Sequence, residues 1–196
     1  MGATSGMLKS AINALNEELR KVGKQVNASE IEDIVTFHAG VGAATGVGGM
    51  LPGAGPIIAT GANVVSIVAM YVRLSKVLGI TLEEGVLKAI ASAVVADISS
   101  AVVGSLALST VLSFIPGIGT VPSAIIVGAA NFGVVYLAAM IFIKLMTVLT
   151  KNRKNVSTMS TDELVNSAKL ISKSIDKDAA IKEAKGVYEE SQKDKK

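Results

Sequence analysis

Two long segments of the chain contain no Asp, Glu, Lys or Arg, and they restrict the fold more than any other feature. They are residues 34–72 and 98–143, which hold 39 and 46 residues. Soluble domains average about 25% charged residues, whereas this chain of 196 residues has 18% and a mean hydropathy of +0.53. Almost all of the charge lies in the two ends and in residues 73–88. This pattern indicates a membrane protein with polar ends.

Each uncharged segment is interrupted by a Pro-Gly motif. The motifs are Leu-Pro-Gly-Ala-Gly-Pro at 51–56 and Ile-Pro-Gly-Ile-Gly-Thr at 115–120. Proline ends the incoming helix, and glycine permits the reversed backbone of a turn. Residues 122–143 would form a helix of about 33 Å, close to the hydrocarbon thickness of about 30 Å. We therefore predict an all-α fold with two hydrophobic helical hairpins, whose tips lie at Pro52, Gly53, Gly55, Pro116, Gly117 and Gly119.

The two ends of the chain are expected to form amphipathic helices beside this hairpin domain. In residues 7–24, apolar side chains recur at spacings of three and four, at Leu8, Ile12, Leu15, Leu19 and Val22. Such a seam favours a helix lying on the rest of the protein or on a membrane surface, and a short coiled coil with a second copy is the alternative. We divide the chain into an amphipathic N-terminal helix (1–28), a hydrophobic helical-hairpin domain (29–150) and a charged helical tail (151–196).

Three helix starts are predicted from capping boxes, in which a Ser or Thr oxygen accepts from an amide and a Glu three residues later bonds back. A glycine at 79, just before the second box, is expected to end the preceding helix. The boxes pair Ser29 with Glu32, Thr81 with Glu84, and Ser160 with Glu163.

The distribution of charge predicts a topology. Both ends and residues 73–88 are charged, whereas both Pro-Gly tips are uncharged, so two hairpins place every charged region on one side. The even number of apolar segments and the Lys/Arg-rich tail predict that both termini are cytoplasmic. The uncharged tips would either cross the bilayer or stop inside it, as wedge-like hairpins inserted from one face.

Two kinds of residue stand out inside the uncharged segments. Gly42 and Gly46 form a GxxxG pattern that lets helix backbones approach closely. Asp97 is an isolated carboxylate whose burial near a bilayer centre would cost about 2.5–3.5 kcal/mol, so it should face other helices or water. Its expected role is an interhelical hydrogen bond, a helix cap or a place near the charged side, and an ion or proton pathway is the alternative. Candidate counter-charges are Arg73, Lys76 and Lys88.

Other chemistry finds little support in the sequence. The glycines at 40, 42 and 46 have GxGxxxG spacing, which differs from the dinucleotide-binding fingerprint, and there is no GxxxxGK[ST] motif. His38 is the only histidine and cysteine is absent, so we expect no metal, no cofactor and no catalytic residue. His38 is expected to be a packing or interface residue, with pH sensing as the alternative. Aromatic residues make up only 4% of the chain, and no basic patch indicates nucleic-acid binding.

Three short motifs carry a resemblance to a known family. They are Leu-Pro-Gly-Ala-Gly-Pro at 51–56, the helix end Leu78-Gly79, and Phe-Ile-Pro-Gly-Ile-Gly at 114–119, which an Ala/Gly-rich helix follows. Over residues 35–148 the chain resembles the hydrophobic helical domain of unknown function that is associated with bacterial Era-like GTPases. The resemblance implies membrane association and a GTPase partner. Because this chain has no GTPase domain of its own, such a partner would act in trans.

Three functions follow as hypotheses. The first is a non-catalytic membrane-embedded protein, an anchor, scaffold or membrane-shaping element that contacts the bilayer and self-assembles as a homo-oligomer. The second is an oligomeric pore or channel, suggested by the glycine-rich helix and Asp97. The third is a soluble helical bundle that buries lipid or self-assembles. In residues 122–143 only Ser123, Asn131 and Tyr136 are polar, so a soluble form would have to hide that helix centrally or in an oligomer.

Overall fold

The computed structural model describes residues 6–48, 60–112 and 123–193, and within these ranges the protein is helical without a strand. The all-α prediction is therefore confirmed. The elements are α1 (Gly6–Lys21), α2 (Ala28–Gly48), α3 (Thr60–Val77), α4 (Glu84–Leu112), α5 (Ser123–Lys151), the 3-10 turn η1 (Val156–Thr158), α6 (Thr161–Ser174) and α7 (Lys177–Lys193).

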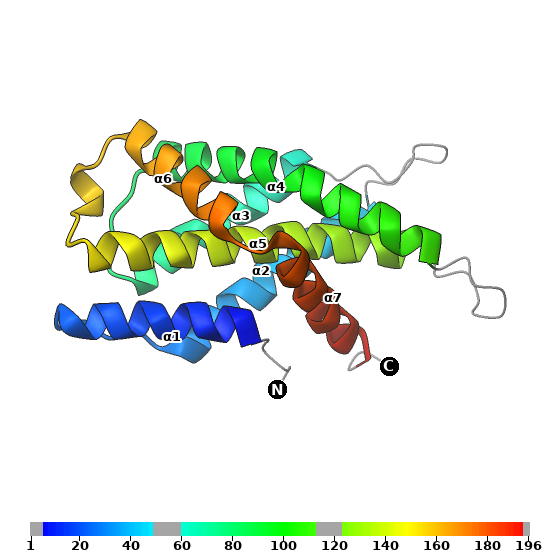
Figure 1. Ribbon diagram of the computed structural model, residues 1–196, viewed down its shortest axis with the longest axis horizontal. Helices are drawn as coiled ribbons and strands as arrows, with labels where there is room; N and C mark the ends of the chain where they lie inside the picture. Colours follow the sequence, from blue (N-terminus) through cyan, green and yellow to red (C-terminus); the bar gives the residue numbers. More distant parts are fainter. Residues whose placement is uncertain (1–5, 49–59, 113–122, 194–196) are drawn as a thin grey trace.

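Helix α5 is the centre of the bundle (Figure 1). It packs against each of the other six helices, and every residue from 131 to 143 is buried. A helix that is apolar on all sides needs partners on all sides, and the uncharged segment 98–143 supplies such a helix. Tyr71 of α3 shows how close the packing is. Its ring stacks on Phe142 at 4.3 Å and its hydroxyl donates to the Ala138 carbonyl at 2.9 Å.

Helices α1, α6 and α7 cover α5 with amphipathic faces. In α1 the predicted seam residues Leu8, Ile12, Leu15 and Leu19 form the buried stripe. Val22, also predicted for the seam, lies beyond the end of α1 and is 46% exposed. In α7 the buried residues Ala180, Ala184 and Tyr188 recur every four positions, as one face of a helix requires. The opposite faces of these three helices carry the charge.

One of the three predicted capping boxes is confirmed. Ser160 caps α6, because its hydroxyl accepts from the Glu163 amide at 3.2 Å while Glu163 accepts from the Ser160 amide at 2.9 Å. Gly79 ends α3 as predicted. It has φ +62°, and the Ile80 amide returns to the Ser75 carbonyl at 2.9 Å.

The other two predicted helix starts are wrong. Helix α2 begins at Ala28, and the Asn27 side chain accepts from the Ser29 amide at 3.0 Å, so an equally strong capping residue two positions earlier starts the helix. Helix α4 begins at Glu84 rather than just after Thr81. The Thr81 carbonyl instead accepts a hydrogen bond from the Ser157 hydroxyl at 3.2 Å, which ties this connection to η1.

The two Pro-Gly tips lie outside the described residues, at 49–59 and 113–122. This applies to Pro52, Gly53 and Gly55 in the first tip and to Pro116, Gly117 and Gly119 in the second. The flanking helices do pack in pairs, α2 against α3 and α4 against α5. The turn geometry of the tips therefore stays a prediction.

Candidate membrane-facing surface

The outer surface of α3 changes from charged to uncharged along its length. Its exposed residues Lys76, Arg73, Ala69 and Val65 follow one another at spacings of three and four, so they lie on one face of the helix. The two basic residues are at the C-terminal end. Toward the N-terminus the face is apolar, and Val65 is 71% exposed.

Helices α2 and α4 continue the same pattern on either side of α3, which packs against both. Every exposed residue in 34–44, 63–72 and 89–99 lacks a charge. We call these residues together the uncharged face. They are Thr36, Phe37, Gly40, Val41, Ala44, Val65, Ala69, Ser92 and Ala96.

Arg73 and Phe37 mark the edge of the uncharged face. The Phe37 ring is 58% exposed, and the Arg73 guanidinium lies 5.5 Å from its centroid. Such a cation–π contact holds the charge beside an apolar ring. No carboxylate of the described residues pairs with Arg73. The edge therefore presents an aromatic ring and an unneutralised cation side by side.

Asp97 lies on a different face of α4 and joins it to the C-terminal helices. Its Oδ2 accepts from Lys177 Nζ at 2.8 Å and from the Ser172 hydroxyl at 2.5 Å. The prediction that Asp97 pairs with Arg73, Lys76 or Lys88 is wrong, because these three residues lie on the outer surfaces of α3 and α4. Burial by itself would raise the pKa of Asp97, but the bonds from Lys177 and Ser172 outweigh burial and lower it.

Glu183 of α7 makes a second polar link, which the sequence did not suggest. Its carboxylate accepts from the Met7 amide at 3.0 Å and the Leu8 amide at 3.3 Å, and also from the Tyr136 hydroxyl at 3.3 Å. A carboxylate at the first turn of α1 satisfies amides that have no partner within the helix. The link joins residues 176 positions apart in the chain, so no local pattern could reveal it.

A polar contact also holds α3 to α5 inside the uncharged part of the bundle. Asn63 Nδ2 donates to Asn131 Oδ1 at 2.6 Å, and Asn131 donates to the Val127 carbonyl at 3.0 Å. Both side chains are fully buried. Hydrogen bonds of this kind between helices are common where the surroundings are apolar, including membrane interiors.

Gly42 lies where α2 packs closely against α5. A Cβ placed on Gly42 would be 2.7 Å from Val135 Cγ2, which no real pair of atoms tolerates without a shift. Glycine at this position lets the two helices come together. Gly46, its predicted companion, belongs to α2, but its surroundings lie outside the described residues.

His38 is buried just behind Phe37. The two rings meet edge to face at 5.1 Å, and the His38 carbonyl accepts from the Ser66 hydroxyl at 3.1 Å. Its Nε2 has no partner among the described residues. Burial, and then the charge of Arg73, lower the pKa of His38 from its ordinary value of 6.5. The neutral ring is therefore favoured.

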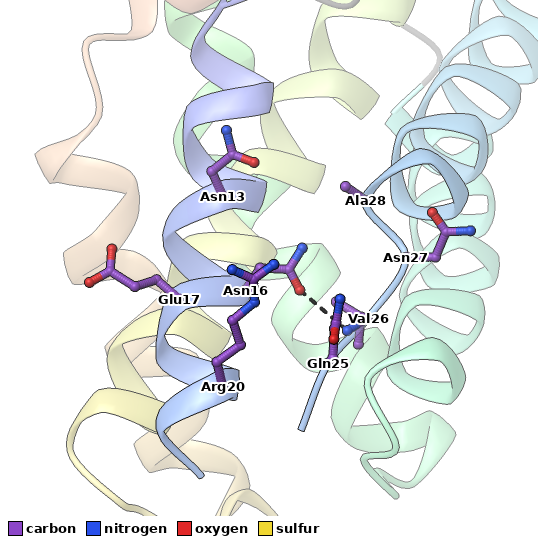
Figure 2. A pocket seen from close by; sticks show the side chains of 8 residues that line it. All are labelled: Asn13, Asn16, Glu17, Arg20, Gln25, Val26, Asn27 and Ala28. Atoms are coloured by element: carbon purple, nitrogen blue, oxygen red, sulfur yellow. Dashed lines mark hydrogen bonds between the residues drawn. The ribbon is translucent and has the colours of Figure 1, made fainter. Parts of the chain in front are cut away.

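A polar groove of about 800 Å³ lies between α1 and the start of α2 (Figure 2). Asn16, pointing from α1, accepts from the Val26 amide at 3.3 Å and so fixes the connection between the two helices. The only charged residues in the lining are Glu17 and Arg20. Within the described ranges, no group of three or more His, Cys, Asp or Glu could hold a metal ion.

Among the described helices, one stretch is long and apolar enough to cross a membrane. It is Val127–Lys151 of α5, which contains an 18-residue window with a mean hydropathy of 2.2. In this structure 83% of that window is buried, as in the core helix of a soluble protein. Length and composition alone therefore give only a weak indication of a membrane location.

Comparisons with family models, with curated proteins and with solved structures find no match for this chain. The resemblance of residues 35–148 to the GTPase-associated helical domain therefore stays a prediction.

Proposed function

We propose that the protein is a non-catalytic, membrane-embedded helical protein that serves as an anchor or scaffold, with its uncharged face in lipid. The observation that supports this most is the composition of that face. In residues 34–44, 63–72 and 89–99, which belong to three adjacent helices, no exposed residue is charged, although 18% of the chain is charged. Single exposed apolar residues are ordinary on soluble proteins, whereas a continuous apolar surface is typical of an interaction site.

The arrangement favours embedding from one side over a complete crossing. The apolar helix α5 is covered by α1, α6 and α7, whose outer faces are charged, so these three helices would have to stay outside the hydrocarbon. We propose that they lie on the cytoplasmic side, together with both termini.

The charged outer side of α1, α6 and α7 would then be free to meet a partner. The family resemblance suggests a GTPase acting in trans, and self-assembly through the embedded helices gives a homo-oligomer. A pore has less support, because the polar residue that suggested it, Asp97, is bonded to Lys177.

A soluble bundle is the second candidate, and one observation favours it. Helix α5 is hidden centrally, as a soluble form of this sequence would require. In that case the uncharged face would be covered by a second copy or by a bound lipid. The two candidates differ in where the protein is found in cells and in what a charge on the uncharged face does.

Membrane fractionation with alkaline-carbonate extraction tests the proposal, using two matched variants. Val65 on the uncharged face and Leu170 on α6 are 71% and 68% exposed, so a lysine at either position costs little folding energy. We expect wild type and Leu170→Lys to resist extraction and Val65→Lys to be released more readily. A charge in the hydrocarbon costs about 2.5–3.5 kcal/mol, which corresponds to a change of about a hundredfold in partitioning.

Recovery of the wild type as a monodisperse species without detergent would overturn the proposal in favour of the soluble bundle. Equal behaviour of the two lysine variants would also contradict it, because the uncharged face would then have no special environment.

A further inference from the structure

Three basic residues lie next to the uncharged face, on the outer surfaces of α3 and α4. Lys76 and Arg73 precede Ala69 and Val65 on α3, and Lys88 precedes Ser92 and Ala96 on α4. All three are exposed. On these two outer surfaces, the first charges met after the uncharged face are therefore all positive. We call Arg73, Lys76 and Lys88 the basic edge.

The basic edge is not neutralised by the protein. Within the described residues, ion pairs join Lys21, Lys177 and Lys185 to carboxylates, but none involves a residue of the basic edge. Glu83 and Glu84 lie further from the uncharged face, at the start of α4. On α2 the corresponding exposed position is Asp33, so the positive charge is confined to the α3–α4 side.

We propose that the basic edge binds the phosphates of anionic phospholipids, while the uncharged face contacts their acyl chains. This inference rests on the proposed embedding and adds a preference for negatively charged lipid. Lysine and arginine at the end of an apolar surface extend their charged groups toward the headgroups. Arginine also presents a fork of donors that matches phosphate oxygens.

Phe37 adds a reason why Arg73 is suited to this place. The exposed ring lies beneath the guanidinium at 5.5 Å and limits where it can go. Aromatic rings are favoured at the level of lipid headgroups. The pair would therefore place an apolar ring and a phosphate-binding group side by side at the level of the headgroups.

The test is flotation of the full chain, made by cell-free translation in the presence of vesicles. One set of vesicles is pure phosphatidylcholine and the other also contains phosphatidylserine. We expect wild type to float with both and to prefer the anionic set, with the preference decreasing as salt is added. Each basic residue near an anionic surface contributes about a fivefold preference. The triple variant Arg73→Gln, Lys76→Gln, Lys88→Gln should therefore lose the preference while still floating.

The control is Lys9→Gln, Lys169→Gln, Lys182→Gln, which removes the same charge from exposed positions on α1, α6 and α7. This control should keep the preference for anionic vesicles. The variant Arg73→Lys, Lys76→Arg, Lys88→Arg should keep it as well, because it retains all three positive charges. Equal loss in both glutamine triples would overturn the inference, because net charge would then be the cause. Equal flotation of wild type with both vesicle sets would overturn it and leave the embedding standing. Failure to float with either set would overturn both.

Discussion

Two sets of helices, α1, α6 and α7 on the one hand and α2, α3 and α4 on the other, both bury apolar residues but differ in the charge of their outer surfaces. Helices α1, α6 and α7 pack apolar residues against α5 and carry charge outside, at residues such as Lys9, Glu17, Lys169 and Glu189. Helices α2, α3 and α4 also pack against α5, yet their outer residues are uncharged over most of their described length. One apolar stripe is enough to hold a helix on a core in water. The uncharged outer residues of α2–α4 are not needed for that packing, and the proposed contact with lipid would account for them.

The largest effect should come from breaking the contact that holds α3 to α5. Replacing Asn131 by Leu leaves the buried Asn63 amide without its partner, which should destabilise the protein by about 1–3 kcal/mol. Replacing both Asn63 and Asn131 by Leu should cost less than Asn131→Leu alone, because no polar group is then left unpaired. Chemical denaturation of the four forms measures this, and purely additive costs would show that the hydrogen bond contributes nothing.

A smaller effect is expected at the link between α4 and the charged helices. Asp97→Asn keeps hydrogen bonding to Ser172 but removes the ion pair with Lys177, so it should cost about 1 kcal/mol or less. Hydrogen exchange should speed up in α7 while α3 is unchanged. If Asp97→Asn instead abolishes an ion flux measured in liposomes, a channel would explain the residue better.

The bonds of Asp97 to Lys177 and Ser172 should make the stability of the protein depend on pH in the acidic range. Because the folded pKa of Asp97 is lowered, its contribution to stability is complete above the ordinary value of 3.8 and is lost as the pH falls through the folded value. Unfolding at a series of acidic pH values should show less sensitivity in Asp97→Asn than in the wild type. Identical pH profiles for the two proteins would contradict the assignment.

The smallest effect concerns His38, which reports on the edge of the uncharged face. As the only histidine, it gives a single imidazole signal in an NMR titration. Its folded pKa is lowered, so stability should decrease as the pH falls from 6.5 through the folded value. Removing the nearby charge with Arg73→Gln should raise the pKa of His38 slightly, whereas Lys169→Gln should leave it unchanged. A lower pKa of His38 in Arg73→Gln would contradict the assignment, because removing a nearby positive charge should raise that pKa.

Sequence patterns predicted the parts of this fold that depend on neighbouring residues. The uncharged run 98–143 contains most of the central helix α5, spacings of three and four gave the α1 seam, and both the Ser160 cap and the Gly79 helix end depend on a few adjacent residues. The start of α2 was missed because Asn27 and Ser29 are both good caps, and the capping-box pattern at Ser29 favoured the later one.

Contacts between distant segments were not predictable in the same way. Asp97 finds its partner 80 residues away, on a helix in the charged tail that sequence alone placed outside the hairpin domain. Glu183 reaches the first turn of α1 across nearly the whole chain. The uncharged face was missed for a related reason. An uncharged run shows only that residues avoid charge, and the packed structure is needed to show which of them remain exposed.

The most direct test of whether the uncharged face lies in lipid is to measure the environment of Val65 on α3 and of Leu170 on α6. The chain contains no cysteine, so Val65→Cys and Leu170→Cys each accept one nitroxide label. In protein bound to vesicles, electron paramagnetic resonance measures the accessibility of each label to oxygen, which concentrates in lipid, and to an aqueous nickel complex. We predict that the label at 65 is accessible to oxygen and protected from nickel, and that the label at 170 shows the reverse. Nickel accessibility at both positions would contradict a lipid environment for the uncharged face.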